Sequence, residues 1–361
     1  MKNQSIVYAG QSDCGLKRSS NQDSFIAADL TRSLRVESTN LSFKTPARLC
    51  GGAFGHLFIV ADGMGGHQGG NRASELAINY FVTNLLNNLR WTLRPDRNSE
   101  QSFLAELQDV LVETHRAIIS ESKSTPDFKG MGTTLTAAYI VWPRLWIVHA
   151  GDTRCYISRR DDLQQLTRDH TMASQLLEQG AITAEEASKS HWASVLWNAI
   201  GADAEEVIAD TYQLELQPGD RLLLCSDGLN KHVDDLAINK LLHDTPDPAT
   251  ACQKLIDLAN SLGGSDNITA IVANFSKYLE PELITSIVPS IENEMILENL
   301  SRFASSADTT GTFPAITNET ADNPPSTNLG TNLGTNSGTN SGTNSGTEAS
   351  KDPEEIDTLD F

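Results

Sequence analysis

Acidic residues beside glycines carry the first chemistry that this sequence suggests. The stretch FIVADGMGGHQGG, residues 58–70, runs from an apolar segment into Asp62 and then a glycine-rich loop. Such a loop can bind phosphate through backbone N–H groups. However, Gly63, Gly65 and Gly69 are spaced one residue too widely for the dinucleotide fingerprint, and Asp62 would repel a pyrophosphate. A divalent cation, which prefers carboxylate and carbonyl oxygens, fits better. In the remaining alternative, Asp62 only caps the following helix.

The same pattern, a carboxylate at the edge of an apolar stretch, occurs three more times. Asp227 follows the apolar run in RLLLCSDGLN, Asp152 lies between the two apolar parts of LWIVHAGDTRCYI, and Asp266 precedes the run in SDNITAIVANF. Repelling carboxylates are unfavourable at strand ends unless a cation gathers them. Each residue alone could belong to a turn, but together they predict a metal site.

The apolar pattern also predicts the elements that would position these residues. Connections of hairpin length, such as VWPRLW and the gap around QPGD, favour an α+β fold with mainly antiparallel sheets and helices packed outside them. Residues 30–55, rich in Ser, Thr and Arg, are expected to form an inserted loop. Strands are predicted at 5–9, 23–28, 56–61, 133–142, 145–150, 153–158, 207–216, 221–226 and 267–275, and helices at 72–90, 101–122, 172–179 and 249–262.

The composition disfavours several classes of protein. The 361 residues are 39% hydrophobic, enough for a large core, and the formal charge of −20 argues against nucleic acid and anionic membranes as partners. We expect no membrane insertion, since no apolar run reaches the ~18 residues of a membrane span. The first residues, MKNQSIVYAG, lack the apolar centre of a signal peptide. The five cysteines are odd in number and form no C-x-x-C pair, which indicates reduced thiols and a cytoplasmic protein.

The end of the chain differs from the rest. Residues 277–361 hold 3 Lys/Arg against 14 Asp/Glu, and they include the repeat TNLGTNLGTNSGTNSGTNSGT. Such a segment cannot bury enough apolar surface to offset the entropy of ordering, so we predict a disordered acidic tail over 304–361. Within 277–303, the stretch SIVPSIENEMILENLSRF has the spacing of a short helix.

A series of motifs along residues 5–275 resembles the metal-dependent serine/threonine protein phosphatases of type 2C, and the form DGMGGH is similar to their bacterial branch. The resemblance implies a catalytic domain over 1–276, folded as a four-layer α-β-β-α sandwich with two central sheets flanked by helices. It also implies a flap over residues 171–201 and a centre of two Mn²⁺ or Mg²⁺ ions. The motifs are SDCGLKRSSNQDSF, FIVADGMGGHQGG, MGTTLTAAYI, VHAGDTRCYI, LTRDHT, LLEQGAITAEEA, VLWNAIG, LLLCSDGLN and SDNITAIV.

The resemblance assigns metal-binding roles to individual residues. It implies that Asp62 bridges the two ions and that Gly63 lends its carbonyl to one of them. Asp227 and Asp266 would complete the ligands of the other ion. Asp23 matches a position that organises metal-bound water.

The resemblance also implies a reaction. Arg18 matches the arginine that binds the substrate phosphate, a role suited to a guanidinium in an acidic site. Phosphoserine and phosphothreonine would be hydrolysed through in-line attack by a hydroxide that bridges the metals. The implied partners are phosphorylated proteins, among them Ser/Thr kinases and their substrates, and we expect a monomer. No side-chain nucleophile is needed, and Ser226 and Cys225 lack the G-x-S-x-G and C-x₅-R surroundings of catalytic residues.

The family pattern also includes a third, weaker metal site, which Asp152 together with Asp227 matches in this sequence. Three positions of this sequence depart from the family pattern. Gln22 stands where many members have Glu. Met64 stands where some relatives have a His that protonates the leaving group, so the general acid is left open between His67 and a metal-bound water, and His67 could instead stabilise its loop. Lys231 stands where relatives often have an acidic residue, which leaves the third site open.

Other classes of function would use the same residues differently. A phosphatase-fold binding protein without catalysis would be expected to have lost a metal carboxylate, whereas Asp62, Asp227 and Asp266 are all present. An adaptor that recruits a partner through its acidic tail is compatible with catalysis. The sequence does not separate a phosphatase dedicated to one regulatory protein from one that opposes kinases broadly.

Truncation after Phe303 tests the assignment of the tail. A polar, repetitive segment without a core should contribute nothing to the chemistry, so kcat for a small aryl phosphate should stay within about twofold of the full chain. Turnover of a phosphoprotein can change, because the acidic end would attract basic surfaces. A large change in kcat for the small substrate would show that the tail folds back onto the site.

Overall fold

The computed structural model describes residues 6–36, 47–88, 100–160 and 162–276, apart from the side chains of 32, 34–36, 47–53, 66–68, 88 and 188. The predicted helix within 277–303 and the predicted tail over 304–361 lie outside these residues. Within them, no helix combines the length and apolar character needed to cross a bilayer.

The described strands form two sheets, and every strand pair in them is antiparallel. The first sheet has the order β1-β12-β11-β7-β8, with β1 at Ile6–Asp13, β12 at Ile268–Phe275, β11 at Arg221–Cys225, β7 at Arg154–Arg159 and β8 at Asp162–Gln165. The second has the order β10-β6-β5-β3-β4-β9, with β10 at Asp210–Glu215, β6 at Arg144–Ala150, β5 at Leu135–Val141, β3 at Ala47–Met64, β4 at Gly132–Thr133 and β9 at Ile200–Gly201. β2 (Asp23–Val36) pairs with β3.

Alternation along the strands builds the layers, because successive side chains point to opposite faces of a sheet. In β3, Ile59 and Ala61 belong to the core between the second sheet and its helices, whereas Phe58 and Val60 belong to the core between the two sheets. β12 divides its side chains in the same way between the inter-sheet core and a third core under the other helices. Both sheets are thus buried on both faces, which explains the nearly continuous apolar runs in the sequence.

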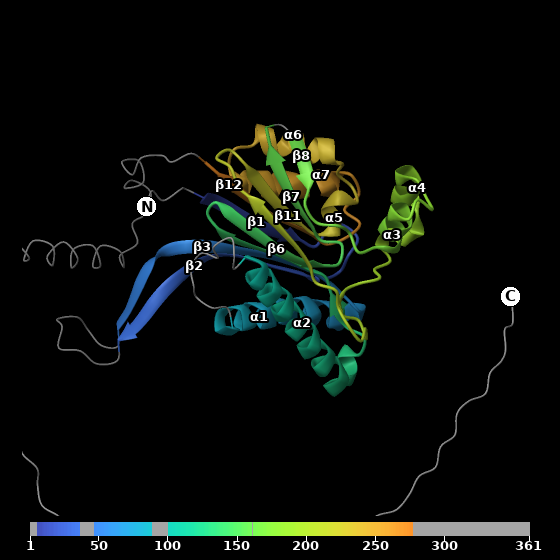
Figure 1. Ribbon diagram of the computed structural model, residues 1–361. Helices are drawn as coiled ribbons and strands as arrows, with labels where there is room; N and C mark the ends of the chain where they lie inside the picture. The colour runs from blue at the N-terminus through green and yellow to red at the C-terminus, as the bar shows by residue number, and fades with distance from the viewer. Residues whose placement is uncertain (1–5, 37–46, 89–99, 161, 277–361) are drawn as a thin grey trace, which may run out of the picture. The chain divides into compact units, whose positions relative to one another are not determined.

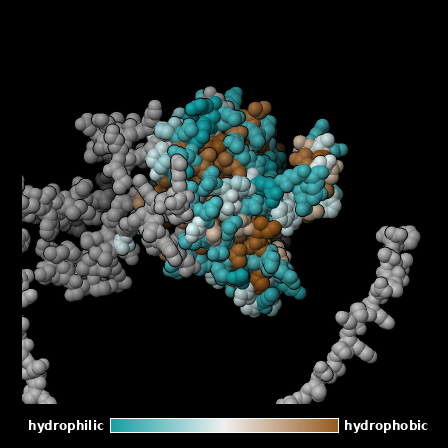
Figure 2. All heavy atoms as spheres, viewed as in Figure 1, coloured by the Kyte–Doolittle hydropathy of each residue, from teal (hydrophilic) through white to brown (hydrophobic). Residues whose placement is uncertain are grey.

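Helices cover the outer face of each sheet (Figure 1). α1 (Gly66–Asn88) and α2 (Glu100–Ser124) pack against the second sheet, and α5 (Asp227–Asn230), α6 (Asp235–Asp244) and α7 (Pro248–Ser261) lie on the first. α2 buries Phe103, Leu107, Val110, Leu111 and Ile118, the spacing of one helix face. The predicted four-layer α-β-β-α sandwich is confirmed. The viewed surface in Figure 2 is mainly hydrophilic with separate hydrophobic patches.

Two sequence predictions need correction. Residues 30–55 are not simply an inserted loop, because 30–36 and 47–55 extend β2 and β3 as a paired hairpin, with residues 37–46 outside the description. The pairing is irregular near Leu30 and Thr31, which explains why this segment shows no clean alternation. α1 begins at Gly66 instead of residue 72, so part of the glycine-rich stretch is helical.

The segment predicted as a flap, residues 171–201, contains short helices on the side of the sandwich marked by α3 and α4 in Figure 1. They are α3 (Met172–Glu178), α4 (Ala184–Lys189) and the 3₁₀ turn η2 (His191–Ser194). Outside this segment, a further 3₁₀ turn, η1, covers Pro126–Phe128. Local capping defines α4, since the Thr183 side chain accepts from the backbone N–H of Glu186 and the Glu186 carboxylate accepts from that of Thr183.

Candidate metal centre

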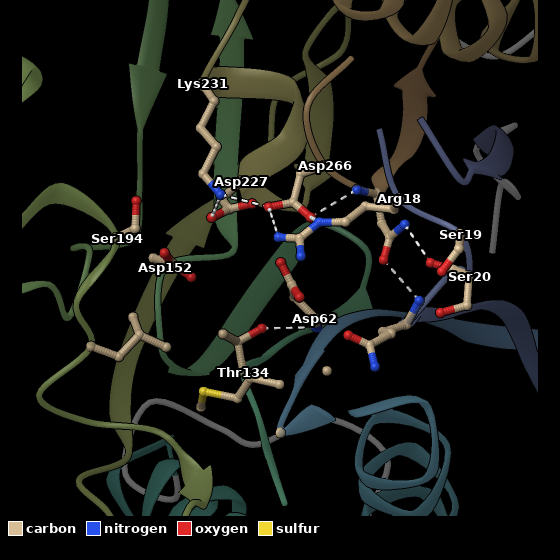
Figure 3. A pocket seen from close by; sticks show the side chains of 16 residues that line it. Arg18, Ser19, Ser20, Asp62, Thr134, Asp152, Ser194, Asp227, Lys231 and Asp266 are labelled. Carbon is tan, nitrogen blue, oxygen red and sulfur yellow. Dashed lines mark hydrogen bonds and ion pairs between the residues drawn. The ribbon is translucent and has the colours of Figure 1, made fainter. Parts of the chain in front are cut away.

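One pocket, of about 390 Å³, gathers most of the residues that the sequence nominated. Figure 3 shows their side chains directed toward a common space from strand ends and from the loop before β2. The lining includes Arg18, Gly63 and the carboxylates Asp62, Asp152, Asp227 and Asp266. Residues separated by more than two hundred positions in the sequence thus meet in one site.

Strand register places Asp23 directly opposite Asp62 at the end of the β2–β3 pair. Residues opposite each other in an antiparallel pair share a face, so two carboxylates meet where like charges are destabilising. Burial raises the pKa of Asp62 well above its usual value, and the charges of Asp23 and Asp227 raise it further. An ionised Asp62 therefore requires positive charge nearby.

Asp23 lies behind the pocket and connects the two sheets. Its Oδ2 accepts hydrogen bonds from Ser226 Oγ and Thr269 Oγ1, each 2.7 Å long. Burial raises its pKa, and these two hydroxyl donors only partly counteract the effect. Its other oxygen, Oδ1, is buried without a hydrogen-bond partner.

The backbone around Asp62 is held from several directions. Asp62 N donates to Thr134 Oγ1 at 2.9 Å, while Thr133 Oγ1 donates to Asp62 O at 2.8 Å. A Cβ at Gly63 would collide with the carbonyl oxygen of Gly70, so this position accepts only glycine. The glycine beside the carboxylate thus permits a close backbone approach.

Asp152 follows a turn that a buried histidine helps to position. Gly151 has φ +116°, which favours glycine, and its N–H donates to His170 Nδ1 at 3.1 Å. Because Nδ1 accepts this hydrogen bond, Nε2 is the nitrogen that can donate to Asp210 Oδ2, 3.0 Å away, and burial lowers the pKa of His170. Burial and then the charge of Asp227 raise the pKa of Asp152.

Two basic side chains engage the remaining carboxylates. Arg18 Nε and Nη2 donate to the two oxygens of Asp266 at 2.8 and 3.0 Å, and Lys231 Nζ lies 2.8 Å from Asp266 Oδ2 and 2.5 Å from Asp227 Oδ2. Burial acts to raise the pKa of Asp266, but these two donors outweigh it and hold that pKa below its usual value. For Asp227 burial outweighs Lys231, and the pKa is raised.

The donor set suits a hard divalent cation, although it is not closed around one point. Among the described residues, no group of three or more His, Cys, Asp or Glu side chains has the arrangement of a metal site as it stands. Asp266 forms ion pairs with Arg18 and Lys231, and Asp227 forms one with Lys231. Asp227 Oδ1 is buried without a hydrogen-bond partner, as is Asp23 Oδ1. Unpartnered carboxylate oxygens in an acidic pocket are what a cation would satisfy.

The structure also decides against Cys225 and Ser226 as nucleophiles. Cys225 is fully buried, and burial raises the pKa of its thiol to about 12. Ser226 is equally buried, and its hydroxyl donates to Asp23. The burial of both residues agrees with their lack of catalytic surroundings in the sequence. The backbone of His67 lies in the first turn of α1, but its side chain lies outside the described residues, so its role as an acid stays a prediction.

Sequence reasoning missed Asn267, which fixes the loop that carries Arg18. Asn267 Oδ1 accepts from Gln22 N at 2.8 Å, and its Nδ2 donates to the carbonyls of Cys14 and Ser20 at 2.9 and 3.0 Å. The only indication of this role in the sequence was the position of Asn267 directly after Asp266. From the predicted flap, Ser194 also lines the pocket (Figure 3).

The chain is also similar in sequence to known proteins. Residues 47–271 match the family described as protein phosphatase 2C, a range that excludes Arg18 and Asp23. The chain is 34% identical over 306 residues to the serine/threonine protein phosphatase PstP of Mycobacterium tuberculosis, covering 84% of this chain and 52% of that protein. It is 35% identical over 216 residues to the serine/threonine phosphatase stp of Listeria innocua, covering 60% of this chain and 83% of that protein.

A solved structure is also similar. The crystal structure of the PstP catalytic domain in complex with two manganese ions has a TM-score of 0.58 and 34% identity, covering 75% of this chain and 99% of that chain. The chain spans about half the length of the M. tuberculosis proteins that it matches.

Replacing Asp62 by Asn should stabilise the metal-free protein. The pKa of an Asp side chain is about 4 in the unfolded chain. When folding raises that pKa, the folded state becomes less stable as the pH increases from about 4 toward the raised value. Thermal unfolding in chelator at pH 7.5 should therefore show a Tm higher by a few degrees in the variant, on the order of 1 kcal/mol. The difference should disappear near pH 4. Asp244→Asn, at a 60% exposed carboxylate, is the control. A lower Tm for Asp62→Asn would mean that Asp62 is not under repulsion.

Proposed function

The chain belongs to the protein phosphatase 2C family, and we propose that it is a metal-dependent phosphatase acting on phosphoserine and phosphothreonine in proteins. The observation that carries the proposal is the pocket in which Asp62, Asp152, Asp227 and Asp266 converge with Arg18. An excess of carboxylates favours a divalent cation, and a guanidinium beside them supplies the contact that a phosphate dianion prefers. The relatives named serine/threonine phosphatases support the choice of substrate.

We assign the metal to Asp62, Asp227, Asp266 and the carbonyl of Gly63, with Asp23 supporting the site from behind. Two Mn²⁺ or Mg²⁺ ions there would supply a nucleophile from water at neutral pH and Lewis-acid polarisation of the phosphoryl oxygens. The manganese-bound structure of PstP supports this choice of ions. The threonines that fix the Asp62 backbone would keep its carboxylate oriented.

Arg18 would hold and orient the substrate. Its hydrogen bonds to Asp266 use two of the five N–H donors of a guanidinium, so the others are available to phosphate oxygens. Its side chain is 53% exposed, which leaves it accessible from solvent. The proposal also includes Ser/Thr kinases and their substrates as the phosphoproteins on which the protein acts. It further includes a monomeric state and a cytoplasmic location. The sequence supports these three points. The catalytic domain over 1–276 and a mobile flap over 171–201 belong to the same proposal.

Metal removal tests the proposed chemistry. Dephosphorylation of a phosphothreonine peptide should fall to background in EDTA and return when excess Mn²⁺ or Mg²⁺ is added, because the proposed nucleophile is a water molecule activated by the ions. Phosphate release with and without chelator gives the measurement, and Asp62→Asn should stay inactive after metal addition. Equal turnover in EDTA and in Mn²⁺ would contradict the proposal.

Replacing Arg18 by Ala should separate substrate binding from metal binding. Loss of charge-assisted hydrogen bonds to phosphate should raise KM by about 10- to 100-fold, with a smaller decrease in kcat. Arg18→Lys should rescue only in part, because an ammonium cannot make the two-pronged contact. Arg116→Ala, which removes a 67% exposed arginine paired with Glu113, is the control. An unchanged KM together with weaker Mn²⁺ activation would make Arg18 a support of Asp266 instead.

A further inference from the structure

Lys231 is placed over the acidic pocket by one helical turn. It follows α5 directly, and its backbone N–H donates to the carbonyl of Asp227 at 2.9 Å. Residues four apart in a helix lie on the same face, so the side chain returns over the Asp227 carboxylate. Figure 3 shows Lys231 reaching down to Asp227 and Asp266.

The ammonium shares its charge between two residues that we assign to the metal. Lys231 Nζ lies 2.5 Å from Asp227 Oδ2 and 2.8 Å from Asp266 Oδ2, although the two aspartates come from different parts of the chain. The side chain of Lys231 is 30% exposed, and those of Asp227 and Asp266 are 11% and 16% exposed. Partial burial weakens screening by water and salt, so this cation acts strongly on its neighbours.

We propose that Lys231 is a resident counter-ion of the pocket, which stabilises the metal-free protein and weakens the binding of divalent metal at Asp227 and Asp266. The assumption that the pocket binds a divalent metal rests on the proposed function, whereas the role of Lys231 as a counter-ion does not. A metal ion that used the Oδ2 atoms of both aspartates would have to displace the Lys231 ammonium. As long as the ammonium stayed near the pocket, its positive charge would repel the metal ion. Lys231 thus competes with the metal for these two carboxylates and sets the metal affinity of the pocket.

A purely structural role predicts the opposite result. If Lys231 only held the two aspartates in the right place, its removal would leave their carboxylates free to separate, and metal would bind less tightly. If Lys231 competes with metal, removing its charge makes the pocket more negative and metal binds more tightly. The sign of the change in metal affinity therefore distinguishes the two roles.

The experiment measures Mn²⁺ binding by calorimetry to the full chain stripped of metal, together with thermal unfolding in EDTA. Lys231→Met and Lys231→Gln should each lower the Kd for Mn²⁺ by on the order of tenfold. Both should also lower the Tm in EDTA and increase the rise in Tm on adding Mn²⁺. Gln keeps a hydrogen-bond donor without the charge, and it carries the test should the Met variant not fold.

Lys189→Met is the matched control, because Lys189 pairs with Glu185 at the same spacing of four residues but with side chains 72% and 79% exposed. It should leave both measurements unchanged. An equal or weaker affinity for Mn²⁺ in both Lys231 variants would overturn the inference while leaving the proposed function intact. No binding of Mn²⁺ by the wild type or the variants would contradict both, and binding by the variants alone would support the competition.

Discussion

Electrostatic repulsion among carboxylates at the strand ends is the constraint on which this site depends. The register of β2 and β3 sets Asp23 against Asp62, while Asp152 lies in the link from β6 to β7 and Asp227 begins α5 just after β11. For each of the four, burial raises the pKa most, and at least one neighbouring carboxylate raises it further, which for Asp227 is Asp266. Such a cluster is stable in its ionised form only with cations among its members, and the described structure supplies Arg18 and Lys231.

The sandwich can hold this strained cluster because the rest of the fold is rigid. Three apolar cores bury both faces of both sheets, so the strand ends have little freedom to move apart. Hydroxyls from the opposite sheet, Ser226 and Thr269, fix the Asp23 carboxylate, and the threonines before β5 fix the backbone of Asp62. Stability is generated away from the site and offsets unfavourable interactions within it, a division common in enzymes.

The sequence predicted the parts of the fold that depend on local pattern. Strands buried on both faces and long amphipathic helices have clear periodicity, and Asp62 and Asp227 adjoin glycine at the ends of such strands. The register that opposes Asp23 to Asp62 depends on pairing between distant residues and leaves no local signal. The extended β2–β3 hairpin was taken for a loop because its polar strands and irregular pairing obscure the alternation. The role of Asn267 arises only from contacts across the chain.

The ion pairs of Asp266 show why the identity of a site residue does not settle its role. Both Arg18 and Lys231 donate to this one carboxylate. The side chain of Arg18 is 53% exposed, whereas that of Lys231 is 30% exposed and also pairs with Asp227, a more buried carboxylate. A metal at Asp266 would compete with both cations, and a phosphate would compete with Asp266 for Arg18. If both ligands bind as proposed, metal at Asp266 weakens the hold of that carboxylate on Arg18 and so favours phosphate. By linkage, phosphate must then favour metal to the same degree.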